Sequence, residues 1–242
     1  MYPTSINDVI FTTVGDERLM KRIVNGDIEF PSSTTNSILL HGRFGTGKTT
    51  ACYLIPALLE YLHASDEDKA QYNWCYEQFG NIVTVTPNNE GKQEVSPANV
   101  KYIDCGNLPL NKIDTFIDSV KRWQEANWSR FVVGAQFNHL ILDEIDSLTP
   151  TSQVKLKGLI TSSGKQNIFY LTTNNFFKVD KSLHSRSHCI EMNGVNSRNI
   201  HLFIQTMRRE FNLEHLTDEQ ISQVVSPSQG DWREIEKGCL RL

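Results

Sequence analysis

The loop GRFGTGKT at residues 42–49 carries residue types that could bind the phosphates of a nucleotide. It matches the pattern GxxxxGK[ST] without a break, follows the apolar run 37–41 and precedes helical spacing over 51–63. Glycines allow such a loop to wrap a phosphate with backbone N–H groups, and the following helix points its positive end at the anion. Lys48 would reach the β- and γ-phosphates, and Thr49 would hold Mg²⁺. The alternative is a glycine-rich turn that carries these two residues by chance.

Two carboxylates follow a second apolar run, in HLILDEID at 139–146. The apolar residues are typical of a buried parallel strand, and Asp143 and Glu144 come at its carboxyl end. Ligands of such sheets bind outside the carboxyl ends of the strands, so both acids are expected to face the same crevice as the loop. Asp143 would bind Mg²⁺ through water, and Glu144 would orient and deprotonate an attacking water. Taken alone, DEID is also compatible with the acidic start of a helix.

A third strand end, LTTNN at 171–175, contributes an amide. Asn174 would lie between the loops of the two previous strands, where it could hold the attacking water or the γ-phosphate. Taken alone, TNN is an ordinary strand-to-turn transition. The weight of Asn174 therefore comes from its position in the chain.

The elements that would position these residues alternate along the chain. Strands are predicted at 37–41, 100–104, 139–142, 168–172 and 188–192. Helical spacing appears between them, as in residues 113–123, where the apolar residues fall on one face. This alternation predicts an α/β fold with a mainly parallel sheet and helices on both faces. From about Ser197 the pattern is all helical, which predicts a small helical domain after the α/β domain.

Residues 64–97 interrupt this alternation. They are polar and rich in turn-forming residues, so we expect a surface insertion that can carry a short hairpin of its own.

Composition excludes several classes of protein. The 242 residues include 39% hydrophobic and 21% charged residues, which is too apolar for a disordered chain. No apolar window approaches a membrane span and the amino terminus lacks a secretory signal, so we expect a cytoplasmic protein without a membrane partner. Five scattered cysteines without a CxxC pair suit a reducing compartment. A net charge of −4 argues against coating nucleic acid with the whole surface, but leaves a local basic patch open.

The order of these motifs resembles that of the AAA+ ATPases, and within them the large subunit of sliding-clamp loaders of bacteriophage type. The likeness starts at TSINDVIFTTVGDERLMKRI and covers essentially the whole chain. The segments that resemble Walker A, Walker B, sensor 1, the Ser-Arg-Cys element and sensor 2 are GRFGTGKTT, LILDEID, LTTNN, LHSRSHCIEM and GDWREIEK. The resemblance implies a P-loop AAA+ parallel sheet flanked by helices at 1–195, with the insertion at about 71–97, and a helical lid domain at 196–242.

The resemblance also implies a role for individual residues. Glu144 would activate water, Asn174 would be the sensor, and Thr49 and Asp143 would hold Mg²⁺. Arg186 would be an arginine finger for the ATP of a neighbouring subunit, and Arg233 would reach the γ-phosphate of its own subunit. The remaining nucleotide-binding residues would be Gly42, Gly45, Thr46, Gly47, Lys48 and Thr50 around the phosphates, with Val9 and Ile10 at the adenine. Without the resemblance, both arginines would be interpreted as solvated or salt-bridged surface residues.

The chain departs from the family pattern at four places. The Ser-Arg-Cys element is Ser-Arg-Ser at 185–187, and Thr161 stands near the place where clamp loaders often have an acidic residue. The insertion holds Cys75 where bacterial clamp loaders have a four-cysteine zinc module, so we expect no zinc. The sequence ends at Leu242, where clamp loaders continue into a collar domain.

The resemblance implies ATP and Mg²⁺ as ligands and hydrolysis of ATP to ADP and phosphate. The implied partners are AAA+ subunits in a homo- or hetero-oligomer, a sliding clamp and primer–template DNA. An AAA+ helicase loader or a transposition-type DNA-binding regulator remains an alternative, and either would form hexamers or filaments. A nucleotide-binding scaffold without hydrolysis is disfavoured by Glu144.

Overall fold

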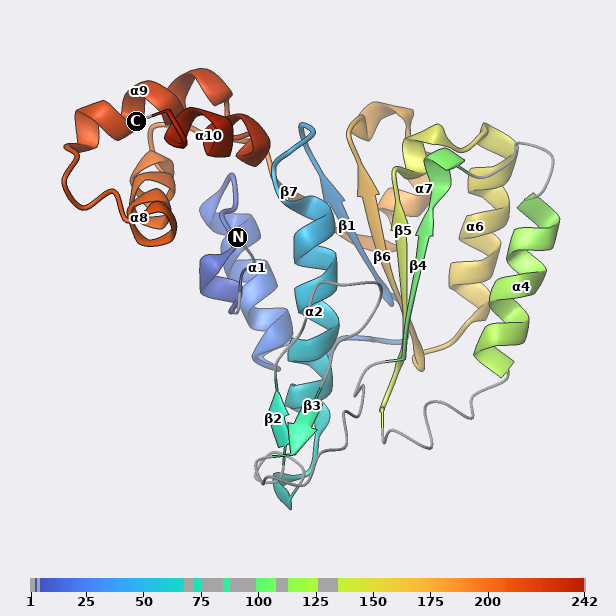
Figure 1. The fold of residues 1–242 in the computed structure, drawn as a ribbon. Coiled ribbons are helices and arrows are strands. Elements are labelled where there is room, and N and C mark those ends of the chain that lie inside the picture. Colours follow the sequence, from blue (N-terminus) through green and yellow to red (C-terminus); the bar gives the residue numbers. More distant parts are fainter. Residues whose placement is uncertain are drawn as a thin grey trace.

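A central sheet of five parallel strands organises the molecule (Figure 1). The computed structural model describes residues 3, 5–67, 72–74, 85–87, 99–107, 113–125 and 135–241. The strands are β1 (Ser37–His41), β4 (Asn99–Asp104), β5 (Asn138–Asp143), β6 (Asn167–Thr173) and β7 (Ser187–Glu191). Their order across the sheet is β4-β5-β6-β1-β7. The predicted α/β fold is confirmed, and each predicted strand agrees with an observed one to within one residue at either end.

Helices cover both faces of the sheet. The helices α1 (Val14–Val24) and α2 (Lys48–His63) lie on one face, with α4 (Ile113–Glu125) and α6 (Pro150–Ser162) on the other (Figure 1). Because side chains alternate along a strand, β1 supplies both cores. Its Ile38 and Leu40 pack towards α1 and α2, whereas Leu39 packs in the core that includes residues of α4 and α6. This double burial explains why the strands are continuous apolar runs.

The turns at the carboxyl ends of the strands contain short helical segments. These are η2 (Cys105–Asn107), η3 (Ile145–Ser147), η4 (Phe176–Lys178) and the four-residue helix α7 (Lys181–His184). They follow β4, β5 and β6, so the loops that carry the predicted acids and Asn174 all leave the same edge of the sheet.

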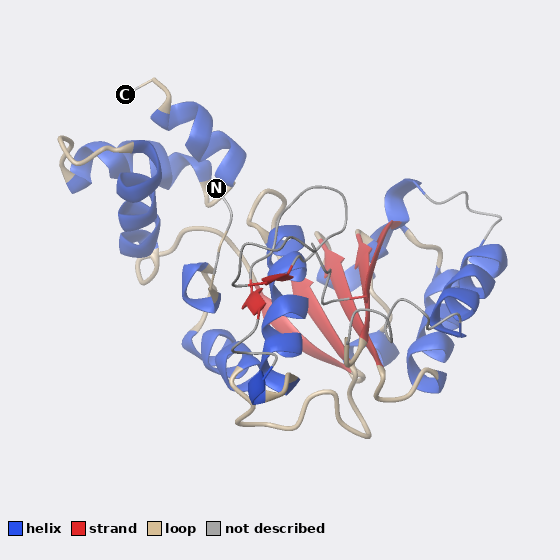
Figure 2. Cartoon of the chain, turned by 60° about the horizontal axis from the view of Figure 1, so that its bottom comes forward, coloured by secondary structure: helices blue, strands red, loops and turns tan. Residues whose placement is uncertain are grey.

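A separate group of helices follows β7. It consists of α8 (Ile200–Phe211), α9 (Asp218–Ser228) and α10 (Trp232–Cys239), set to one side of the sheet (Figure 2). A core of its own holds them together, made of Phe203, Ile204, Met207, Leu213, Ile221, Val225, Ile235 and Cys239. The amino-terminal segment with η1 (Ile6–Asp8) lies between this helical unit and α1 (Figure 1). None of the described helices is long and apolar enough to cross a bilayer.

The region of the predicted insertion contains two short described strands. They are β2 (Tyr72–Trp74) and β3 (Val85–Pro87), and they pair antiparallel, as the expected hairpin requires. Residues 68–71, 75–84 and 88–97 lie outside the described residues, and with them Cys75 and the expectation about zinc.

A buried polar network lies beneath α2. The carboxylate of Glu60 contacts His139 Nε2 at 2.8 Å, and His139 Nδ1 contacts the Tyr170 hydroxyl at 2.8 Å. The same carboxylate accepts the backbone N–H groups of residues 136 and 137 at 2.7 and 2.9 Å. Glu60 is 2% exposed and His139 is fully buried, so every one of these groups depends on its partner. The network ties α2 to β5 and β6.

We expect Glu60→Ala to lower the free energy of unfolding by about 3 kcal/mol, because it leaves a buried imidazole without its carboxylate partner and two part-buried backbone N–H groups without their acceptor. Urea denaturation followed by circular dichroism measures this. Glu29→Ala is the control, since Glu29 forms an exposed ion pair with Lys165 and should cost less than about 1 kcal/mol. Equal losses for the two variants would contradict a structural role for the network.

Candidate nucleotide-binding site

A cavity of about 320 Å³ opens between the sheet edge, the amino-terminal segment and the helical unit. The loop 44–50 forms its floor, and Asp143, Glu144, Thr172 and Asn174 come from the strand ends. From the other side it is lined by Asp8, Val9, Ile10, Thr206, Met207, Arg209, Phe211, Trp232, Arg233 and Glu236. The structure therefore brings the loop, both acids, Asn174, Arg233, Val9 and Ile10 to one cavity.

The glycines of the loop are required by its backbone. Gly42, Gly45 and Gly47 have φ values of 146°, 74° and 88°, a region that residues with a Cβ rarely adopt. A Cβ on Gly42 would also clash with the Met192 carbonyl, and one on Gly45 would clash with the Asp231 carboxylate. The loop thus needs glycine for its turn and for the close approach of neighbouring segments.

Lys48 lies folded into the loop at the start of α2. Its side chain is 6% exposed, and Nζ donates to the carbonyl oxygens of Gly42, at 3.0 Å, and of Arg43. Burial lowers the pKa of this ammonium to about 8, although the nearby Asp143 carboxylate opposes the shift. Carbonyl dipoles only partly compensate a buried positive charge. A phosphate group in the cavity would supply the missing negative charge.

Asp143 is the polar centre of the site. Thr49 Oγ1 lies 3.0 Å from each oxygen of its carboxylate, the Tyr102 hydroxyl donates to it at 3.0 Å, and Thr172 Oγ1 donates as well. Burial and this carboxylate both raise the pKa of Tyr102, which keeps its hydroxyl protonated as a donor. Tyr102 was not among the predicted residues, although its place two residues before the end of a predicted strand was a usable signal.

The oxygen ligands next to the loop suit Mg²⁺. Within the described part of the chain, no group of three or more His, Cys, Asp or Glu side chains is arranged to hold a metal. A cation here would depend on the Thr49 hydroxyl, the Asp143 carboxylate and the phosphates. Mg²⁺ prefers oxygen ligands and is usually bound by one or two protein groups together with phosphate and water, so the residues fit this ion.

Glu144 and Asn174 meet at the mouth of the cavity. Asn174 Nδ2 donates to Glu144 Oε1 at 3.4 Å, and both residues are exposed. Glu144 has a left-handed backbone with φ of 56°, and its N–H donates to Thr172 Oγ1 at 3.0 Å. This backbone turn takes Glu144 out of the strand direction, while Asp143 stays with the strand. The two adjacent acids can therefore do different work.

The helical unit contacts the loop directly. The backbone N–H of Trp232 donates to the Gly45 carbonyl at 2.9 Å, and the Asp231 carboxylate, which caps α10, packs on Gly45. Arg209 of α8 pairs with Asp8 at 3.5 Å across the cavity wall. No local pattern in the sequence points to Arg209, because its importance comes only from this tertiary contact.

Arg186 lies outside this cavity. The hydroxyl of Ser37, the first residue of β1, donates to the Arg186 carbonyl at 2.7 Å. Since the loop leaves the other end of β1, about five residues on, roughly 16 Å of strand separates Arg186 from the loop of its own chain. Its guanidinium instead donates to Thr161 Oγ1 and to the Ser182 carbonyl, each at 3.0 Å.

Comparison with known proteins finds relatives among replication proteins. No protein-family model matches the chain. A putative replication factor C small subunit of Acanthamoeba polyphaga mimivirus is 28% identical over 141 residues, which are 55% of this chain and 41% of that protein. Replication factor C subunit 4 of Encephalitozoon cuniculi is 27% identical over 139 residues, or 56% and 45% of the two chains. The matched part thus spans less than half the length of either relative.

Solved structures show a similar fold. The RuvB Holliday junction branch migration motor of Thermotoga maritima has a TM-score of 0.61 at 14% identity and covers 99% of this chain and 64% of its own. DnaA of Aquifex aeolicus, bound to AMPPCP, has a TM-score of 0.51 at 20% identity. The match covers 93% of this chain and 61% of the DnaA chain. At such low identity these likenesses establish the arrangement of elements alone.

We expect nucleotide affinity to fall as the pH rises above 8. The Lys48 ammonium loses its proton near this pH in the chain by itself, and a neutral amine attracts phosphate far less. The dissociation constant of ADP should increase up to about tenfold per pH unit. Titration calorimetry from pH 7 to 9.5 measures this, with Lys48→Met as a control that binds weakly at every pH. A flat wild-type profile would contradict the assignment of Lys48 to the phosphates.

Proposed function

We propose that the chain is an AAA+ protein of clamp-loader type, which hydrolyses ATP as a subunit of a DNA sliding-clamp loader. Motif order, sheet topology and the replication factor C relatives support this proposal. One observation carries the proposal: a glycine loop with a buried lysine faces two acids and an amide across a single cavity. This arrangement can bind a polyphosphate and place a water beside it.

The loop is proposed to hold the phosphates. The N–H groups at the start of α2 and the Lys48 ammonium would bind the β- and γ-phosphates, with Gly42, Gly45, Thr46, Gly47 and Thr50 shaping the loop. Thr49 and Asp143 would hold Mg²⁺, which, when bound, neutralises charge on the phosphates. Val9 and Ile10 line the cavity, where Ile10 packs against the core of the helical unit, and both would contact the adenine.

Glu144 is the proposed general base. Its carboxylate would take a proton from a water as the water oxygen attacks the γ-phosphorus, and the bond from that phosphorus to the bridging oxygen of ADP breaks. Asn174, 3.4 Å from Glu144, would orient the same water. Both side chains are exposed at the mouth of the cavity, where a water can reach them.

The helical unit is proposed to act as a lid. We assign residues 1–195 to the nucleotide-binding domain and 196–242 to the lid, which the contact between Trp232 and Gly45 supports. Arg233 lines the cavity from α10 and would bind the γ-phosphate of its own chain. A shift of α10 on nucleotide binding would therefore change its contact with the loop.

Arg186 is proposed to serve a neighbouring AAA+ subunit. Its place at the amino end of β7 keeps it from the loop of its own chain, yet it lies at the surface of the sheet domain. A guanidinium next to the γ-phosphate stabilises the charge that develops during transfer, and supplying it from a neighbour makes hydrolysis depend on assembly.

Further partners follow from the family. A ring clamp and primer–template DNA would be the objects that the assembled subunits act on, inside the cell. The relatives favour this function over the alternative of a helicase loader or transposition regulator, because they are replication factor C subunits. The likeness to DnaA concerns the fold alone.

Glu144→Gln should keep ATP binding within about twofold while lowering turnover by about 10² or more, because the amide preserves shape but cannot accept the proton. Calorimetry gives the affinity and phosphate release gives the turnover. Glu214→Gln, an exposed change between α8 and α9, is the control. Normal turnover in the Glu144 variant would place the base elsewhere.

Lys48→Ala and Arg186→Ala chains should each be inactive alone and regain part of the turnover when mixed. In a mixed assembly, some interfaces pair an intact loop from one variant with an intact Arg186 from the other. Arginine fingers are worth ~10³ or more in turnover, so the recovery is measurable by phosphate release.

The control for this mixing is Arg198→Ala, which removes an exposed arginine that pairs with Glu17. Assemblies of that variant alone should stay active, without a second variant mixed in. If the Lys48 and Arg186 variants co-assemble by light scattering and no activity returns, the role of Arg186 in a neighbouring site is wrong.

A further inference from the structure

Three aromatic rings form a continuous stack behind the candidate site. The centroid of the Phe176 ring lies 4.0 Å from that of His184, with 5° between the ring planes. It lies 4.2 Å from that of His41, whose ring is tilted by 38°. These distances are at or below the usual range for aromatic pairs, so Phe176 is held on both sides. The neighbouring Phe177 is 95% exposed and stands edge-on to Phe176, outside the stack.

Each ring belongs to a different functional segment. His41 ends β1 and directly precedes Gly42, the first glycine of the loop. Phe176 begins η4, two residues after Asn174. His184 ends α7, two residues before Arg186. The stack thus joins the phosphate loop and the Asn174 segment to the arginine that lies at the other end of the sheet domain.

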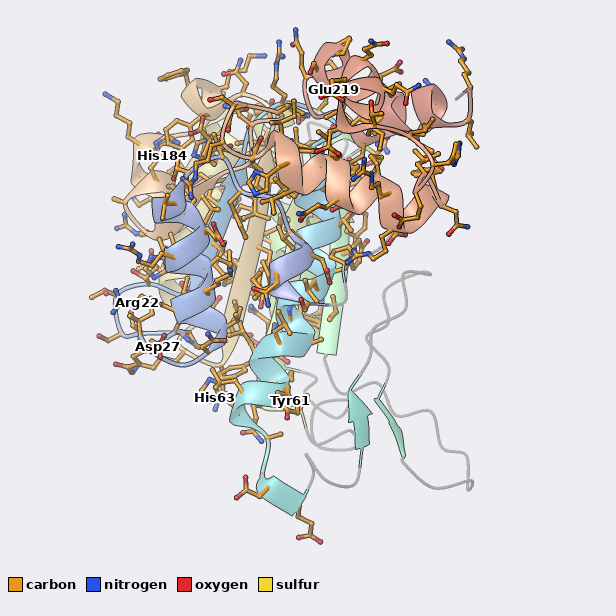
Figure 3. All side chains as sticks on the ribbon, turned by 90° about the vertical axis from the view of Figure 1, so that its left-hand side faces the viewer. Arg22, Asp27, Tyr61, His63, His184 and Glu219 are labelled. Carbon is orange, nitrogen blue, oxygen red and sulfur yellow. The ribbon has the colours of Figure 1, made fainter. Side chains whose placement is uncertain are left out.

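His184 is held to Phe176 by the contact between their rings, and its Nε2 is buried without a hydrogen-bond partner. Burial lowers the pKa of His184 and of His41, which favours neutral rings in the stack. Figure 3 shows His184 on the sheet domain, well apart from Glu219 of the helical unit.

Backbone hydrogen bonds link Arg186 closely to α7, the helix that contains His184. The Ser185 N–H donates to the Lys181 carbonyl at 3.1 Å, and the Arg186 N–H donates to the Leu183 carbonyl at 3.2 Å. The Arg186 guanidinium donates to the carbonyl of Ser182 in α7. A displacement of α7 would therefore act on Arg186 through these bonds.

A helix as short as α7 has few hydrogen bonds of its own, so side-chain contacts must fix it. Leu183 anchors one side in the core, and Asp180 caps the start. At the end that leads to Arg186, the His184 ring packs on Phe176, while the Ser37 hydroxyl donates to the Arg186 carbonyl and the guanidinium donates to Thr161 Oγ1. The placement of Arg186 accordingly depends on where Phe176 lies as well as on these two anchors.

We infer that Phe176 and His184 are positioning residues, which link the loop and the Asn174 segment of one chain to the placement of Arg186 towards the next chain. This inference rests on the proposed role of Arg186 in a neighbouring site. It adds that the position of the Phe176 ring in the subunit that offers Arg186 sets how well the arginine is placed. Any movement of Asn174 or of the loop shifts the stack, and the stack shifts α7.

Mixed assemblies test the inference because one chain supplies Arg186 and a different chain binds ATP, so a substitution can be placed in either one. The Lys48→Ala chain serves as the donor, which contributes Arg186, and the Arg186→Ala chain serves as the acceptor, which binds ATP. His184→Leu in the donor should lower the recovered turnover about tenfold or more, since small misplacements of a catalytic group are costly. The same substitution in the acceptor should leave turnover within about twofold.

Two further comparisons distinguish positioning from general damage. His184→Phe in the donor keeps a ring for stacking and should restore at least half of the turnover. Phe176→Leu in the donor should resemble His184→Leu, whereas the matched change Phe177→Leu, outside the stack, should have no effect. If His184→Leu fails to fold, the comparison of Phe176→Leu with Phe177→Leu tests the role of the stack instead.

The outcomes separate this inference from the proposed function. Recovery in the parental mixture, combined with equal losses in donor and acceptor or no loss in the donor, overturns the role of the stack alone. No recovery in a co-assembled parental mixture overturns the role of Arg186 and the inference with it. A loss confined to the donor, with rescue by His184→Phe, supports the positioning role.

Discussion

The carboxylate of Asp143 fixes the geometry on which the site depends. It accepts hydroxyl groups from Thr49, Tyr102 and Thr172, which come from the start of α2, from β4 and from β6. One charged group at the end of β5 therefore sets the register of the loop against two neighbouring strands. Hydrogen bonds to a charged group are about twice as strong as neutral ones, which suits this role. Lys48 adds a positive charge to the same pocket.

The nucleotide cavity and Arg186 lie at opposite ends of the sheet. The carboxyl ends of the strands carry the cavity, whereas Arg186 lies at the amino end of β7. Parallel strands make this separation unavoidable, because all the loops that leave their carboxyl ends meet at one edge. With the proposed role of Arg186, a chain built this way would offer one half of a site to each neighbour. The aromatic stack runs from His41 to His184 and provides a physical connection between the two halves.

The sequence was sufficient for the features that local chemistry dictates. Buried parallel strands need apolar runs and the loop needs glycine, so the strands, Lys48, Asp143 and Glu144 could be found directly. Contacts between distant segments could not be predicted, because no local pattern encodes them. Examples are the contacts of Tyr102 with Asp143, of Trp232 with Gly45, and of the rings in the stack. Helix α2 begins at Lys48, three residues before the predicted apolar spacing, because polar residues of the loop already form its first turn.

The central claim is that one chain carries an incomplete site, which a neighbour completes. The most direct measurement is ATP turnover per chain over a range of protein concentrations, with the assembly state determined by analytical ultracentrifugation in the same samples. The account predicts that turnover per chain is minimal where the chain is monomeric and rises together with assembly. Equal turnover per chain in monomeric and assembled samples would contradict it, because the catalytic groups would then all belong to one chain.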